Sequence, residues 1–139
     1  MPSDLLAAWA RSAEVVLAAD AGADRLREAG ASPDWIVGDM DSVVDLAHHM
    51  GSQVRLHADQ DSTDCDKLLA LAHELGYGQI TLGGIEGDRM DHALATWLSA
   101  ARSELDVRLA LRRGLGWALT PGRALVGGSR PGAAVSLLP

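Results

Sequence analysis

The stretch VVLAADAGAD at residues 15–24 decides the fold class of this chain of 139 residues. Its first half is a continuous apolar run, which is typical of a strand that is buried on both faces. Asp20 ends the run, and residues 22–29 have the composition of a short helix that Gly30 and Pro33 would end. A buried strand, a turn and a helix form the repeating unit of α/β proteins.

The same alternation recurs along the chain. We expect further strands at residues 35–37, 53–57 and 79–82, and helices at 43–50, 63–75 and 88–103. After residue 105, apolar residues alternate with polar ones or lie between Gly and Pro, and residues 135–139 resemble another strand. The sequence therefore predicts an α/β fold with a three-layer, Rossmann-like open sheet. The sheet is mostly parallel, and a C-terminal antiparallel β region begins beside it.

Composition argues against several classes of protein. The net charge of −7 disfavours a partner with a phosphate backbone, which would need a basic face. No apolar run approaches the roughly 20 residues of a membrane span, and the first residues lack the pattern of a signal peptide. Cys65 is the one cysteine, so no internal disulfide can form. We therefore expect a cytoplasmic protein without nucleic-acid or membrane partners.

Acidic side chains gather where the expected strands end. Asp20 follows the first strand, Asp39 and Asp41 the second, residues 59–64 the third and residues 86–92 the fourth. These ends share one edge of a parallel sheet, the edge at which open α/β folds bind ligands. A single Asp at such a turn is more often a helix cap, but one cap per helix suffices. Clustered carboxylates repel one another unless a cation neutralises them, and oxygen ligands suit Mg2+.

Four segments, in order, resemble the motifs of the thiamine pyrophosphokinase family. Residues 38–42 (GDMDS) match G-D-x-D-S, and residues 59–67 (DQDSTDCDK) match D-Q-D-x-T-D-x-x-K. Residues 19–24 (ADAGAD) resemble A-D-G-G-A-N. Residues 84–92 (GIEGDRMDH) resemble G-x-x-G-G-R-x-D-H, with Asp88 in place of the second glycine of the G-G pair. The nine-residue match at 59–67 is the most specific of the four.

The resemblance implies a reaction and an organisation. A thiamine diphosphokinase transfers a diphosphate group from ATP to the hydroxyl of thiamine, with Mg2+, and gives thiamine diphosphate and AMP. Residues 1–112 would form the α/β nucleotide-binding catalytic domain. Residues 113–139 would begin a truncated β-rich domain that binds thiamine. The family also suggests a homodimer.

The resemblance further implies roles for individual residues. The expected Mg2+ ligands are Asp39, Asp41, Asp61 and Asp64, which together with Asp91 form the expected catalytic set. The expected ATP and phosphate contacts are Asp20, Gln60, Thr63, Lys67 and Arg89.

Simpler roles stand beside some of these. Lys67 could pair with Asp64, Arg89 could form a surface salt bridge with Asp88 or Asp91, and Thr63 could be a plain helix cap. Asp91 could be a metal ligand or a general base, with His92 as the alternative base.

Other functions remain open from the sequence. A related diphosphokinase that acts on a pterin alcohol would share the ATP and Mg2+ apparatus and differ in its acceptor pocket. A non-catalytic MgATP-binding fragment that lacks the acceptor domain would bind the nucleotide without releasing AMP. A purely structural α/β module would leave the carboxylate clusters unexplained.

Overall fold

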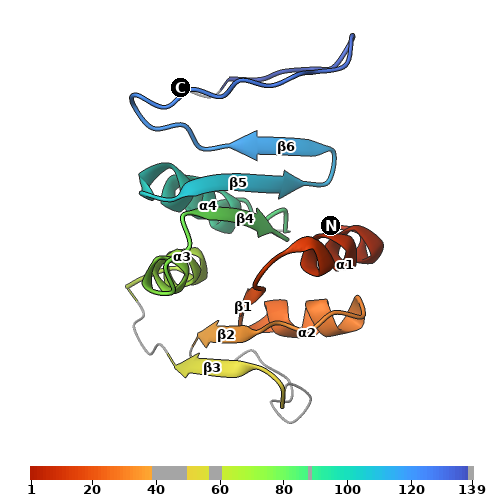
Figure 1. Cartoon of the computed structure of the whole chain (residues 1–139), viewed down its shortest axis with the longest axis vertical. Coiled ribbons are helices and arrows are strands. Elements are labelled where there is room, and N and C mark those ends of the chain that lie inside the picture. Colours follow the sequence, from red (N-terminus) through yellow and green to blue (C-terminus); the bar gives the residue numbers. More distant parts are fainter. Residues whose placement is uncertain (39–49, 57–60, 88, 138–139) are drawn as a thin grey trace.

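The computed structural model describes residues 1–38, 50–56, 61–87 and 89–137. Helices and strands alternate, as the sequence predicted (Figure 1). In chain order the elements are α1 (Ser3–Ser12), β1 (Leu17–Ala19), α2 (Ala21–Glu28), β2 (Trp35–Gly38), β3 (Gln53–Leu56), α3 (Asp64–Glu74), β4 (Gln79–Gly83), α4 (Met90–Arg102), β5 (Asp106–Leu111) and β6 (Gly114–Trp117). The expected helix at 43–50 lies outside the described residues.

The described strands form two sheets of three strands. One sheet has the order β1-β2-β3 and is parallel throughout. The other has the order β4-β5-β6, in which β4 and β5 are parallel and β6 returns antiparallel to β5. The α/β class with mostly parallel strands is thus confirmed. The arrangement differs from the expected single open sheet, because no strand in the described part of the chain joins β1 to β4.

Helices cover both faces of the first sheet. Ala18 and Ile36 are register partners on one face, where they form a small core with Ala23 and Leu26 of α2 and with residues of α1. The helix α3 packs against β1 and β2, and Leu17 contacts the core cluster that contains α3 residues. Successive strand residues face opposite sides, so this alternation places α1 and α2 on one face and α3 on the other.

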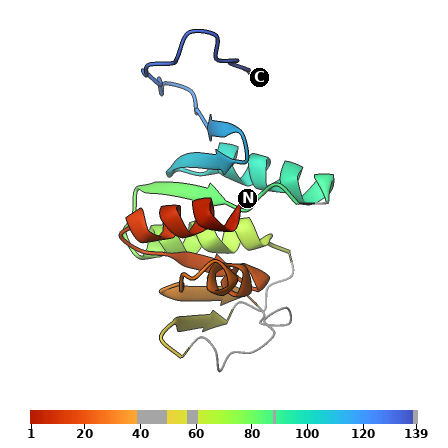
Figure 2. The same cartoon turned by 90° about the vertical axis from the view of Figure 1, so that its right-hand side faces the viewer.

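The second sheet has a larger core on one of its faces. Side chains of α3, α4, β4 and β5 meet there; the buried ones are Cys65, Leu69, Ala72, Leu82, Ala100, Leu105, Val107 and Leu109. Complete burial of a Val, Leu or Ile side chain stabilises the fold by about 1.5–3 kcal/mol. The helix α3 therefore packs on both sheets and joins them. Figure 2 shows α3 beside the strands of both sheets.

The C-terminal tail departs from the expectation of further strands. Residues 118–137 contain no strand, and residues 135–137, expected to begin one, lie outside any regular element and are exposed. Val135 is 77% exposed and Leu137 is 88% exposed. A strand needs a neighbour for its backbone hydrogen bonds, and the sheet β4-β5-β6 ends at β6. No helix among the described residues is long and apolar enough to cross a membrane.

Candidate functional site

The expected site lies at the carboxyl ends of β1 to β4, which lead into the motif segments. β1, β2 and β3 are parallel neighbours, so their carboxyl ends lie at one edge of the first sheet, whereas β4 belongs to the second sheet. The described members of the predicted set are Asp20, Asp61, Thr63, Asp64, Lys67, Arg89 and Asp91. Asp39, Asp41 and Gln60 lie outside the described residues, and their roles stay predictions.

Asp20 is the most constrained of the described site residues. It is 7% exposed and stands at the N-cap of α2 with φ 38° and ψ −117°. Its backbone N–H donates to the carbonyl of Val37 at 3.3 Å, and its carboxylate occupies the space where a β-carbon on Gly38 would lie. A positive φ at a residue other than glycine costs free energy and is enriched at functional sites. Asp20 thereby holds a carboxylate at the end of β2.

Thr63 and Asp66 form a capping box at the start of α3. The hydroxyl Oγ1 of Thr63 accepts from the N–H of Asp66 at 3.1 Å and donates to Asp66 Oδ2 at 2.6 Å. Asp66 Oδ2 also accepts from the N–H of Thr63 at 2.9 Å. Thr63 is therefore a helix cap, the simpler of its two expected roles. Asp66 is not among the site residues expected from the sequence, although a Thr followed three residues later by an acid is the signal for this motif.

The carboxyl group of Asp66 links α3 to α4. Partial burial raises its pKa, but hydrogen bonds from Ser99 and then from Thr63 outweigh this effect, and the pKa lies below its ordinary value. The charge of Arg102 acts in the same direction. Asp66 is thus ionised at neutral pH and fixes the entrance of α3 against α4.

Asp61 and Asp64 flank this cap, and both side chains are exposed. Backbone N–H groups at a helix N-terminus favour anions, so phosphate oxygens can bind there. Lys67 lies one turn further along α3 and is only 6% exposed. No ion pair joins Lys67 to Asp64 in the described part of the chain, so the simpler role expected for Lys67 is not seen.

Arg89 and Asp91 form an exposed, two-point ion pair before and within the first turn of α4. Arg89 Nη2 donates to Asp91 Oδ2 at 2.5 Å, and Nε donates to Oδ1 at 3.2 Å. The hydrogen bond from Arg89 lowers the pKa of Asp91 to about 2. A carboxylate of such low pKa is a weak proton acceptor, so Asp91 does not have the raised pKa that would suit a general base.

Within residues 1–38, 50–56, 61–87 and 89–137, no group of three or more His, Cys, Asp or Glu side chains is arranged to hold a metal ion. The chemistry of the expected donors, carboxylate oxygens only, fits Mg2+ and not a thiolate-bound or imidazole-bound metal.

Comparison with known proteins gives one family. The family model described as "Thiamin pyrophosphokinase, catalytic domain" matches residues 6–109. That interval contains all four motif segments and every residue of the expected site. None of the curated proteins matches the chain.

Solved structures of similar fold have the same family name. The thiamine pyrophosphokinase from Bacillus subtilis is 24% identical with a TM-score of 0.62, and the match covers 79% of this chain and 54% of that chain. The thiamin pyrophosphokinase from Geobacillus thermodenitrificans is 27% identical with a TM-score of 0.58, and the match covers 79% of this chain and 53% of that chain. The chain thus spans about half the length of these structures.

Proposed function

Because this chain belongs to the thiamin pyrophosphokinase catalytic-domain family, we propose that it transfers a diphosphate group from ATP to the hydroxyl of thiamine. The products would be thiamine diphosphate and AMP, and the reaction would require Mg2+. The match covers only about half of each of these relatives, so the activity of this chain by itself is part of the proposal.

One observation supports the proposal most directly. The four motif segments follow the carboxyl ends of four successive strands, where α/β folds bind their ligands. Two of these segments enter the N-termini of α3 and α4, which offer free N–H groups to phosphate oxygens. A sequence that merely capped its helices would need one polar side chain at each of these points.

The chain's own residues would share the work of binding and neutralisation. Asp39, Asp41, Asp61 and Asp64 would hold Mg2+, and the bound ion would neutralise charge on the phosphates. Asp20 would contribute a fixed carboxylate at the end of β1. Gln60 and Lys67 would orient the nucleotide at the entrance of α3, which Thr63 caps.

Arg89 would bind phosphate by exchanging partners. Its guanidinium group presents a planar fork of donors that fits a carboxylate or a phosphate equally well. In the free protein Asp91 occupies that fork. We propose that the nucleotide replaces Asp91 there, which leaves Asp91 available to a metal ion or to the acceptor hydroxyl.

The wider organisation follows the family. We propose that residues 1–112 form the nucleotide-binding domain, and that residues 113–139 begin the thiamine-binding region. Because α3 packs on both sheets, we propose that the two sheets and the helices that cover them form one Rossmann-like domain of three layers. We further propose a homodimer in the cytoplasm.

The test is an assay of AMP release from MgATP with and without thiamine, with thiamine diphosphate identified as the second product. Thiamine-dependent AMP supports the proposal. If AMP release depends on a pterin alcohol and not on thiamine, the acceptor is the pterin alcohol. Binding of MgATP with no AMP from either acceptor would make the chain a nucleotide-binding module.

A further inference from the structure

The sheet β4-β5-β6 has a second, polar face. Val107 and Leu109 of β5 belong to the core under α3 and α4, so Asp106 and Arg108 face the other way. Trp117 of β6 is the antiparallel register partner of Arg108, and cross-strand partners share a face. An indole and a guanidinium group therefore lie side by side on the face that α3 and α4 leave uncovered.

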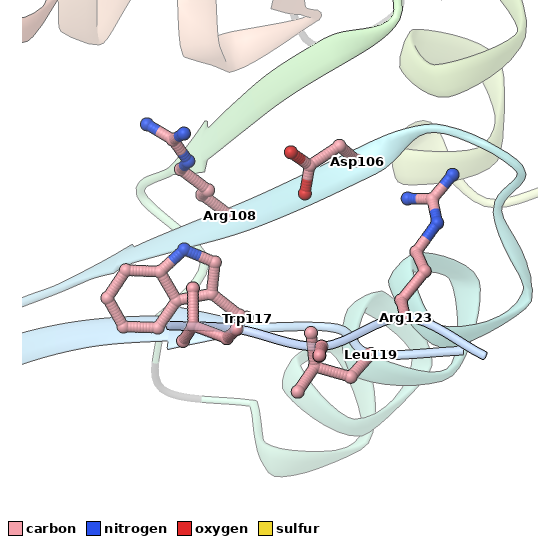
Figure 3. Close-up of a pocket in the computed structure, with 7 residues that line it drawn as sticks. Asp106, Arg108, Trp117, Leu119 and Arg123 are labelled. Carbon is pink, nitrogen blue, oxygen red and sulfur yellow. The ribbon is translucent and has the colours of Figure 1, made fainter. Parts of the chain in front are cut away.

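A cavity of about 290 Å3 lies on this face, between β5, β6 and the C-terminal tail. Figure 3 shows Asp106, Arg108, Trp117, Leu119 and Arg123 around it, with Asp106 between the two arginines in this view. Its volume is at the lower end of the range for small-molecule sites, about 300–1,000 Å3. The cavity is at the amino end of β5, since Asp106 pairs with Gln79 at the start of β4. The candidate phosphate site follows the opposite, carboxyl ends of the strands.

Several of the polar groups are held in place. Gln79 Nε2 donates to Asp106 Oδ2 at 2.9 Å, and Arg123 Nη2 donates to the backbone carbonyl of Glu104 at 2.9 Å. Arg108 Nε is buried and has no hydrogen-bond partner among the described residues. A buried donor without an acceptor is rare in folded proteins and calls for a partner.

From this set we propose that the cavity binds a small aromatic monocarboxylate. The two guanidinium groups and one carboxylate in its wall leave a net charge of +1, which a monoanion neutralises. A planar carboxylate pairs with the terminal nitrogens of Arg108 and Arg123, and the aromatic ring packs on the indole of Trp117. Asp106 accepts a hydrogen bond from a hydroxyl or amino group of the ligand.

The same charges disfavour other occupants. Thiamine carries a positive thiazolium ring, which the net positive charge of the cavity wall repels. Inorganic phosphate can satisfy the arginines but gives the Trp117 ring no partner. The aromatic ring and the single negative charge are both needed.

The experiment uses 4-hydroxybenzoate as the probe and its neutral match, 4-hydroxybenzamide, as the comparison. Binding to the whole chain is measured by calorimetry, and the indole N–H signal of Trp117 is followed by NMR. We expect saturable binding of the acid, a shift of the Trp117 signal, and binding of the amide at least about tenfold weaker, since a charge-assisted contact is lost.

Variants separate the pocket from the general charge of the protein. Arg108→Gln should weaken binding of the acid by about tenfold or more, whereas Arg113→Gln, at the exposed turn after β5, should leave it unchanged. If Arg108→Gln does not fold, Arg123→Gln takes its place with the same expectation. Equal affinity for acid and amide, no saturable binding, or equal losses in the pocket variant and Arg113→Gln would each overturn the proposal.

Discussion

The carboxylate of Asp20 occupies the place beside Gly38 that a β-carbon at position 38 would take. Gly38→Ala should therefore destabilise the protein, by about 1–3 kcal/mol as is usual for an overpacked core site. Urea unfolding measures this loss. Gly51→Ala is the matched control, because a β-carbon there would have no neighbour within 4 Å.

The double variant Asp20→Ala, Gly38→Ala tests the cause. Removing the carboxylate makes room for the new methyl group. The double variant should therefore lose less stability than the sum of the losses in Asp20→Ala and Gly38→Ala alone. Simple additivity would show that the two side chains do not compete for this space.

The capping box makes a separate prediction about the start of α3. Thr63→Ala removes the acceptor for the N–H of Asp66 and should cost about 1 kcal/mol, within a range of about 0.5–2 kcal/mol. Thr63→Ser keeps the hydroxyl and should lose much less. Thermal unfolding compares the three proteins, and equal stability of the Ala and Ser variants would contradict the role of the hydroxyl.

The lowered pKa of Asp66 predicts a dependence of stability on pH. A group whose pKa is lower in the folded state stabilises the protein above its unfolded pKa, and loses that contribution as the pH falls through the folded pKa. The free energy of unfolding should therefore fall as the pH falls from about 5 through the unfolded pKa and then the folded pKa of Asp66. In the Asp66→Asn variant the free energy of unfolding should fall less steeply over the same range. Parallel pH profiles for the two proteins would contradict this.

The ion pair of Arg89 and Asp91 can be followed by NMR titration of the Asp91 carboxyl carbon. We expect a pKa of about 2 in the free protein. Arg89→Gln should raise the pKa of Asp91 toward its ordinary value, while Arg113→Gln should not. If Asp91 turns to the acceptor hydroxyl when the nucleotide binds, saturating MgATP should also raise this pKa. An unchanged pKa with MgATP bound would exclude that form of the exchange, because only a cation beside Asp91, either Arg89 or a metal ion, keeps the pKa low.

The expected metal ligands make the sharpest prediction for activity. Asp39→Asn and Asp61→Asn should each lower thiamine-dependent AMP formation by about 100-fold or more, since each removes a charge that would help to hold Mg2+. Asp4→Asn, in the first turn of α1, is the control and should leave the rate unchanged. Wild-type rates in Asp39→Asn or Asp61→Asn would remove that residue from the metal site.

Most of the elements could be predicted from the sequence because they rest on local patterns. The apolar run at 15–19 predicted β1, which begins two residues later, at Leu17. The helical spacing after residue 63 predicted α3, and Gly76 follows its end with φ 86°, as in a Schellman motif. The prediction of a strand at 135–139 was wrong for residues 135–137, and the reason is physical. Apolar residues such as Val135 form a strand only beside a partner strand, and none of the described strands pairs with them.

The site was less accessible to prediction because its geometry depends on contacts between distant segments. The pattern at 19–24 marked Asp20, but its positive φ and its fit beside Gly38 arise only when β1 pairs with β2. For Arg89 and Thr63 the sequence left two roles open, and the structure shows the simpler contact for each. The cavity beside Trp117 combines residues of β5, β6 and the tail, which no local pattern relates.

The position of α3 against both sheets has a consequence for cooperativity. Cys65, Leu69 and Ala72 on this helix belong to the core of the second sheet, while the same helix packs against β1 and β2 of the first. If α3 separates from one sheet, the apolar surface that it covers on the other sheet is also exposed to water. We therefore expect the two sheets to unfold in a single transition, and substitutions that destabilise the start of α3 to destabilise both.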